Sequence, residues 1–439
     1  MDKIFDALLR GLNFIESTKF IRRVEMKNLN FKVLKHDKPT ETTRGSGIYK
    51  DRPQTPNIKK AVSGEAFVFI GILALFFGCV GHVMGGVNMM NTLMNTAYQL
   101  LMDTVFYIMG IAVLAGAVSG LMSEFGVVSL INKALSPLMK PLYDLPGAAT
   151  IGVVTCYMSD NPAILTLADD EGFRKYFKKY QLPALTNIGT CFGMGLIITT
   201  FMIGIPSPTG ENFGVAALIG NLGAVIGSIV STRLMLIQTK KYYGTEAWCV
   251  EGGAGDTMSM DYRTIRSGNV SSRFIESMLA GGKVGVEMGM AIIPGVLIIC
   301  TVVLMLTNGP SATGEYTGAA YEGVALLPWI GEKISFILKP LFNFSSSQAI
   351  AVPITALGAA GAAIGLVPKM VETGVAHAND IAVFTAMCMC WSGYLSTHVA
   401  MMDGLKCSHL TNKAIISHTI GGLCAGVAAN IMYRLISLF

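Results

Sequence analysis

The sequence predicts an all-α integral membrane protein with about seven transmembrane helices, two re-entrant hairpins and two interfacial amphipathic helices. Its composition is 52% hydrophobic and only 14% charged, whereas a soluble domain carries about 25% charged residues. The 49 glycines suit a membrane interior, where small residues let helices pack closely. Several apolar runs approach the roughly 20 residues that a helix needs to span lipid. These runs are 66–84, 105–121, 188–205, 215–229 and 288–306.

Hydropathy divides the chain into five parts. The predicted spans are 62–84, 98–122, 183–206, 212–237, 279–306, 376–402 and 413–437. The parts are a basic tail with an amphipathic helix and a linker (1–60), a first span with an external loop (61–97), a first repeat (98–237), a linker loop (238–278) and a second repeat (279–439).

The distribution of charge predicts the orientation. Residues 1–60 hold 14 Lys and Arg against 7 Asp and Glu, so the tail carries all of the excess positive charge. Such a tail ahead of a membrane span favours a cytoplasmic N-terminus over a nucleic-acid-binding role. The connections 123–182 and 238–278 hold six and five Lys and Arg residues, whereas 307–325 has none and carries Glu315 and Glu322. We therefore expect a multi-pass protein of a bacterial cytoplasmic membrane.

Two regions do not read as ordinary spans. In 126–170 an amphipathic stretch precedes the apolar run 148–158, the break Ser159-Asp160-Asn161-Pro162 and a second short run at 163–168. In 326–372 an amphipathic stretch precedes a polar entry at 345–348 and an interrupted apolar run. Each apolar half is too short to cross lipid. Each region is therefore predicted to form an interfacial helix followed by a re-entrant hairpin.

The two regions also match in letters. Lys140-Pro141-Leu142 corresponds to Lys339-Pro340-Leu341, and the spacing from Lys140 to Lys339 defines a repeat offset. Three spans separate equivalent points, so the two repeats are predicted to have opposite orientations in the membrane. Paired interrupted segments in inverted halves are typical of the central site of a transporter. The alternative is two kinked full spans in a bundle that does not transport.

Several short motifs resemble a known family. They are Leu145-Pro146-Gly147, Tyr157-Met158-Ser159-Asp160-Asn161-Pro162-Ala163 and Asn187-Ile188-Gly189-Thr190. With them the chain resembles the YjiH-type membrane proteins with Gate, or nucleoside-recognition, domains, as a fusion of two shorter members. The segment Ser396-Thr397-His398-Val399-Ala400 is distantly similar to ethanolamine permeases, and the order of elements is similar to concentrative nucleoside transporters. Where nucleoside carriers typically have Gln-Thr-Glu at the first hairpin tip, this chain has Ser159-Asp160-Asn161.

Candidate binding residues in the first half lie in the hairpin break and the next span. An ionisable group at membrane depth is costly, so Asp160 with Ser159 and Asn161 is predicted to bind a solute or a coupling ion. A cap on the second half-helix is the alternative role for Asp160. Asn187 and Thr190 share a helix face and either line the same cavity or bond between helices.

Candidate residues in the second half are Ser346, Ser347 and Gln348 at the hairpin entry and Thr397 and His398 in the sixth span. The serines and Gln348 could instead form an ordinary helix start. His398 could carry a proton or orient a solute, or it could be a hydrogen-bonded packing residue.

We therefore expect a secondary transporter of a small polar solute (a nucleoside, an amine or a similar metabolite) that works by alternating access. The sequence has no ATP-binding motif, so uphill transport would need H⁺ or Na⁺. No nucleophile–base arrangement or metal-ligand spacing is present in the sequence, so neither an enzyme nor a resident cofactor or metal is expected. The expected partners are the solute and the lipid bilayer, with no nucleic acid, and homo-oligomerisation stays open. The alternative function is a non-transporting Gate-domain scaffold or signalling component.

Overall fold

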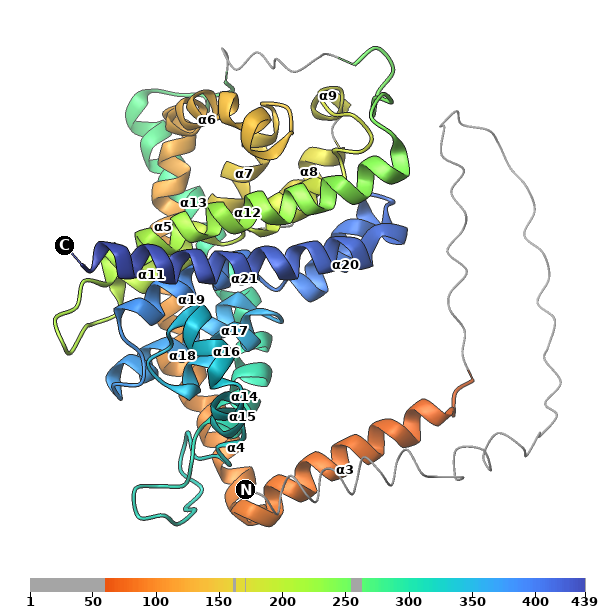
Figure 1. The fold of residues 1–439 in the computed structure, drawn as a ribbon. Coiled ribbons are helices and arrows are strands. Elements are labelled where there is room, and N and C mark those ends of the chain that lie inside the picture. Colours follow the sequence, from red (N-terminus) through yellow and green to blue (C-terminus); the bar gives the residue numbers. More distant parts are fainter. Residues whose placement is uncertain (1–59, 161–162, 170, 254–262, 439) are drawn as a thin grey trace. The chain divides into compact units, whose positions relative to one another are not determined.

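The computed structural model describes residues 60–160, 163–169, 171–253 and 263–438. Within these ranges the chain is helical (Figure 1), and its β-type pairing is one isolated bridge between Lys178 and Trp248. Six of the described helices are long and apolar enough to cross a membrane. The predicted all-α membrane fold is therefore confirmed. The predicted tail helix lies outside the described residues.

The chain forms two compact units, Met1–Met89 and Met90–Phe439. The first unit contains α3 (Gly64–Met84), which matches the predicted span 62–84. Gly85, with a φ of 80°, leads directly into α4 (Gly86–Gln99). The external loop predicted up to residue 97 is thus helical. Thr92 and Thr96 in this stretch are buried side chains of the helix.

Two long helices exceed the thickness of a bilayer. One continues from α4 through the π-helical turn η1 (Leu100–Val105) into α5 (Phe106–Glu124), 39 residues in all. The other joins α13 (Val270–Gly295), the π-helical turn η2 (Val296–Cys300) and α14 (Thr301–Thr307), 38 residues in all. At 1.5 Å per residue each is about 57 to 58 Å long, against about 30 Å of hydrocarbon.

Glycines let these two helices touch through their backbones. A Cβ atom on Gly281 would lie 2.1 Å from the carbonyl oxygen of Gly116, and one on Gly285 would lie 2.3 Å from that of Ala112. The stripe Gly281, Gly285 and Gly289 on α13 therefore serves close helix packing.

The remaining helices form two sets. In the first half they are α6 (Val127–Tyr143), α7 (Ala149–Met158), α8 (Ala163–Asp169), α9 (Glu171–Arg174), α10 (Ala184–Thr190), α11 (Gly195–Gly204) and α12 (Phe213–Tyr243). In the second half they are α15 (Leu326–Lys333), α16 (Ser335–Phe342), η3 (Ser347–Ile350), α17 (Ala351–Ala356), α18 (Ala360–Glu372), α19 (Ala378–Cys390), α20 (Tyr394–Gly404), η4 (Ser408–Leu410) and α21 (Thr411–Ile436).

The repeat offset recurs in the backbone. The helix α6 spans residues 127–143, and the α15–α16 pair spans residues 326–342. Their first residues, and likewise their last residues, are separated by the same number of positions as Lys140 and Lys339. Each segment then ends at a residue with left-handed backbone, Asp144 (φ 56°) and Asn343 (φ 50°), at the same spacing again. The carbonyl of Leu142 accepts a bond from Arg233 of α12, and that of Leu341 accepts one from Asn430 of α21. The end of each segment is thus bonded to one of the two long helices α12 and α21.

The helices α12 and α21 lie side by side in Figure 1. A Cβ atom on Gly227 would come within 2.5 Å of the carbonyl oxygen of Gly421, so this contact also depends on glycine. The second unit therefore contains two glycine-packed helix pairs, one formed by α5 and α13 and the other by α12 and α21.

Candidate functional site

Two helices of the second unit are interrupted midway. The predicted span 183–206 consists of α10 and α11, separated by Cys191–Met194. The predicted span 376–402 consists of α19 and α20, separated by Trp391–Gly393. The last residue of each break has left-handed backbone: Met194 has a φ of 55° and Gly393 a φ of 66°. The repeat offset also relates these two residues, so each break interrupts the helix at the same place.

The second hairpin is bonded to one of these breaks. Its two arms are η3–α17 and α18, and its tip is Leu357–Ala359. The backbone N–H of Gly393 donates to the carbonyl of Ala356 at 3.2 Å, and that of Leu395 donates to Leu357 at 3.3 Å. Hairpin tip and helix break thereby satisfy each other's backbone groups, as irregular backbone at membrane depth requires.

The first hairpin rests on the other break through Tyr157. The ring covers Gly195, where a Cβ atom would lie 2.2 Å from a ring carbon. The hydroxyl donates to the side-chain oxygen of Asn221 at 3.0 Å, and Asn221 donates to Thr199 at 2.8 Å. This contact joins α7, α11 and α12.

A buried chain of hydrogen bonds lies between the interrupted helices and the α12–α21 pair. His418 directs Nε2 at the carbonyl of Cys390, which can only accept, so Nε2 carries the proton. In the neutral ring Nδ1 then accepts, and the Ser231 hydroxyl 2.9 Å away donates to it. The side-chain amide of Asn187 in turn donates to Ser231 at 3.0 Å. His418 is therefore fully satisfied as a neutral imidazole.

His398 is not fully satisfied. The Thr190 hydroxyl donates its proton to the carbonyl of Thr186 at 2.8 Å and so can only accept from His398 Nδ1, 3.4 Å away. The other ring nitrogen, Nε2, is then an acceptor, and among the described residues it has no partner. His398 is fully buried. A buried acceptor without a partner costs about 1–3 kcal/mol.

Aromatic rings surround this unpartnered acceptor. The centroids of His398 and His418 are 4.6 Å apart, and Tyr394 packs edge-on against His398 at 5.8 Å. Trp391 stacks on Tyr394 at 6.2 Å. The Trp391 Nε1–H is likewise buried without a partner among the described residues. Trp391 in the α19–α20 break and His398 on α20 thus place one unpartnered donor and one unpartnered acceptor, among the described residues, beside the ring of Tyr394.

The structure brings together three of the predicted site residues: Thr190 contacts His398, and Asn187 joins the same network through Ser231 and His418. Ser159 ends α7, and the carbonyl of Asp160 accepts the N–H of Ala163 at the start of α8. Asn161 lies outside the described residues.

The predicted residues at the second hairpin entry make local bonds. Ser346 accepts the backbone N–H of Gln348 as the cap of η3, and the backbone of Ser347 packs on Gly331 of α15. Thr397 donates to the carbonyl of Gly393 at 3.0 Å, within the first turn of α20.

Two residues of the network, His418 and Ser231, were not predicted from the sequence. Both are polar residues in apolar spans, which is the signal that singled out His398. The same signal could therefore have found them.

The fold and the site define a multi-pass helical membrane protein with two interrupted helices, each capped by a hairpin. No protein-family model matches the sequence, and no curated protein matches it. Among solved structures, the chain is similar to a variant of CNTnw, a concentrative nucleoside transporter, in an outward-facing state, with a TM-score of 0.51 and 13% identity over 85% of both chains.

Further structures of CNTnw are similar at lower scores. One in an intermediate state matches with a TM-score of 0.49 and 13% identity over 84% of this chain and 86% of the other. At 13% identity, the similarity between this chain and the outward-facing structure establishes a shared fold. The predicted resemblance to Gate-domain proteins stays a prediction.

Proposed function

We propose that this protein is a secondary transporter that moves a small polar solute across the membrane by alternating access. The observation that carries the proposal is the pairing of two interrupted helices around a buried polar network with an unpartnered acceptor on His398. Interrupted helices expose backbone dipoles and hydrogen-bonding groups at membrane depth. The fold shared with an outward-facing transporter structure supports the same interpretation.

The chemistry of the site favours a solute with a hydrogen-bond donor. A hydroxyl or an N–H group can bond to His398 Nε2 and remove the cost of the unpartnered acceptor, and the Trp391 N–H can bond to an acceptor on the same solute. Nucleosides carry both kinds of group together with an aromatic base. Because the similar structure is named for nucleoside transport, a nucleoside is the first candidate, followed by small amines. H⁺ or Na⁺ remains the proposed coupling ion.

The internal repeat supports the proposed mechanism. The repeat offset relates helix ends, left-handed residues and helix breaks in the two halves. This is the pattern expected of two copies of one unit. If three spans separate equivalent points, the two hairpins enter from opposite faces. Each hairpin can then gate access from one side to the network between them, which is how inverted repeats produce alternating access.

Uptake into proteoliposomes tests the proposal. Purified protein should accumulate labelled uridine, adenosine or ethylamine when a Na⁺ gradient or a pH gradient is imposed. Asp160→Asn and His398→Gln are each expected to lower uptake at least tenfold, because one alters the first hairpin break and the other the unpartnered acceptor. Glu276→Gln is the matched carboxylate control, since Glu276 is exposed on α13 and bonded to Ser272.

Two results would contradict the proposal. Unchanged uptake in both site variants would place the solute elsewhere. If folded and correctly inserted protein shows neither uptake nor thermal stabilisation by these solutes, the result would favour a non-transporting scaffold.

A further inference from the structure

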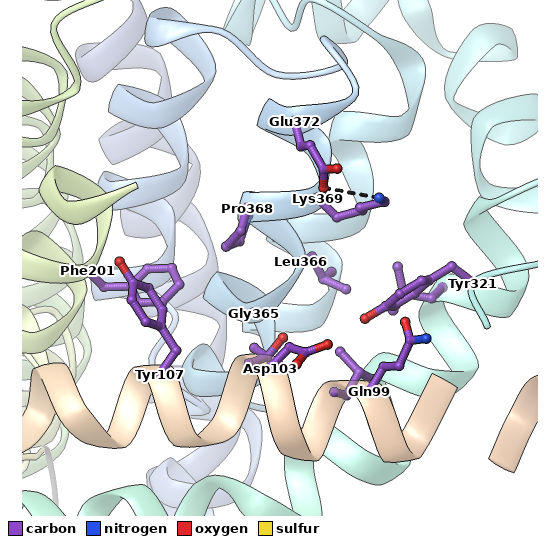
Figure 2. Close-up of a pocket in the computed structure, with 13 residues that line it drawn as sticks. Gln99, Asp103, Tyr107, Phe201, Tyr321, Gly365, Leu366, Pro368, Lys369 and Glu372 are labelled. Carbon is purple, nitrogen blue, oxygen red and sulfur yellow. Dashed lines mark hydrogen bonds and ion pairs between the residues drawn. The ribbon is translucent and has the colours of Figure 1, made fainter. Parts of the chain in front are cut away.

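A cavity of about 250 Å³ lies between the η1 turn, α18 and the loop before α15, with Phe201 of α11 in its wall (Figure 2). Its polar lining is Gln99 and Asp103 from α4–η1, Tyr321 from the loop, and Lys369 and Glu372 from α18. This volume is below the roughly 300–1,000 Å³ that hold drug-sized ligands, and it suits a small metabolite.

Asp103 gives the cavity its charge. It lies in the π-helical turn η1, and π-helical turns are frequent at functional sites. No hydrogen bond or ion pair joins its carboxylate to another of the described residues. Asp103 is an exposed residue of a helix that is long and apolar enough to cross a membrane, and an ionisable residue in such a helix by default marks a functional site. Figure 2 shows it directed toward the space between η1 and α18.

The other charges of the cavity offset each other. Lys369 Nζ lies 3.1 Å from Glu372 Oε2, one turn along α18. This pair is formally neutral, so Asp103 leaves the cavity with a net negative charge. A bound anion would have to displace Glu372 from Lys369 and face Asp103 as well.

Aromatic rings form the rest of the wall. Tyr107 and Phe201 meet at an angle with centroids 5.8 Å apart, and Tyr321 faces the cavity from the loop (Figure 2). Burial, and then the charges of Asp103 and Glu372, raise the pKa of the Tyr321 phenol, so both carboxylates act on its hydroxyl.

The loop holds Tyr321 in place. Its backbone is left-handed (φ 66°), and its N–H donates to Thr96 at 2.8 Å. The next residue, Glu322, is buried and accepts bonds from the backbone of Thr317 and Gly318. Although burial alone raises the pKa of Glu322, these hydrogen bonds hold it below its usual value. The wall of the cavity is therefore built in advance of any ligand.

We propose that this cavity binds a small organic ammonium ion, with Asp103 pairing with the positive charge and the rings of Tyr107, Phe201 and Tyr321 packing around the alkyl groups. An unneutralised carboxylate beside aromatic faces is the chemistry that recognises organic cations. The cavity is too roomy to coordinate a bare metal ion closely. Binding of an ammonium ion to this cavity can be measured at equilibrium. This proposal therefore does not depend on whether the protein transports a solute.

Thermal unfolding of the full-length protein in detergent tests this site. Tetramethylammonium chloride and ethylammonium chloride are titrated at constant ionic strength against sodium chloride and sodium acetate. At least one ammonium salt should raise the unfolding temperature in a saturable way, and neither sodium salt should. Asp103→Asn should weaken the apparent affinity at least tenfold. Glu332→Gln, an exposed carboxylate on α15, is the matched control and should not change it.

A second comparison separates this cavity from the proposed transport site. His398→Gln should leave ammonium binding unchanged even if it stops uptake. If Asp103→Asn does not fold, Tyr107→Leu removes one ring of the wall and should weaken binding instead. Three results would overturn the proposal. The first is that neither ammonium salt shifts the unfolding temperature, and the second is that the shift survives Asp103→Asn. The third is that the shift is lost in His398→Gln but not in Asp103→Asn.

Discussion

At the scale of single residues, the centre of the molecule is defined by which polar atoms have partners. The chain from Asn187 through Ser231 to His418 matches every donor with an acceptor. This arrangement leaves no site on His418 for a ligand. The adjacent His398 keeps one nitrogen without a partner among the described residues. Two histidines with ring centroids 4.6 Å apart thus differ in hydrogen bonding: His418 has both ring nitrogens bonded, and His398 has one without a partner among the described residues.

Ser231 provides the test of this assignment. Ser231→Ala removes the donor to His418 and the acceptor for Asn187, so two buried groups lose a partner. The expected loss of stability is about 1–3 kcal/mol, measured by equilibrium unfolding in mixed micelles.

The next residue is the control. Thr232 is fully buried, and its hydroxyl has no partner among the described residues. Thr232→Val removes an unsatisfied group at equal volume and should be neutral or stabilising. Equal losses from the two substitutions would show that the network contributes nothing beyond packing.

The sequence predicts part of this site because polar residues in apolar spans are rare. Asn187, Thr190 and His398 stand out on that basis alone. Their common network could not be predicted, because it is completed by Ser231 on α12 and His418 on α21, and only the packing of these helices with α10 and α20 brings the residues together. The cavity at Asp103 was missed for a similar reason: Tyr321 and Glu372 belong to the other half of the chain.

At the scale of helices, the structure depends on where glycine permits contact and where it permits a break. Gly393 supplies the left-handed residue that ends the α19–α20 break, and Gly281 and Gly285 allow α13 to touch α5. Long apolar runs predicted the spans well, since length and hydropathy are local properties. The break within 376–402 was not predicted, because Trp391-Ser392-Gly393 is too short to interrupt an apolar window.

The glycine contact between α5 and α13 has a simple test. Gly281→Val would place side-chain atoms against the backbone of Gly116, where a Cβ alone would lie 2.1 Å from the carbonyl oxygen. The helices would have to separate, so we expect a large fall in unfolding temperature and in the yield of monodisperse protein.

Gly110→Ala on α5 is the matched control. Nothing lies within 4 Å of a Cβ atom built there, and alanine favours a helix over glycine by up to about 1 kcal/mol. This variant should be as stable as the parent or slightly more so. A Gly281→Val protein that unfolds at the parent's temperature would contradict the close packing.

At the scale of the whole chain, one repeat offset relates interfacial helices, left-handed residues and helix breaks. The halves diverge before this register begins. The connection from α5 to α6 consists of residues 125 and 126, whereas the one from α14 to α15 spans residues 308–325 and carries Tyr321 and Glu322. The loop that carries Tyr321 at the cavity therefore has no counterpart of similar length between α5 and α6.

The orientation of the chain can be tested at the two ends of a single helix. Ser267 precedes α13 and Ser311 follows α14, and the 38 helical residues of Val270–Thr307 lie between them. At 1.5 Å per residue they extend about 57 Å, which exceeds the roughly 30 Å of hydrocarbon, so the two serines should lie on opposite sides of the membrane. The basic residues around Ser267 and the acidic ones around Ser311 place Ser267 inside and Ser311 outside.

An impermeant maleimide applied to intact cells should therefore label Ser311→Cys and not Ser267→Cys, after subtraction of the labelling of native cysteines. Permeabilised cells should show labelling of both. Labelling of Ser267→Cys alone would reverse the orientation, and labelling of both in intact cells would show that this helix does not cross.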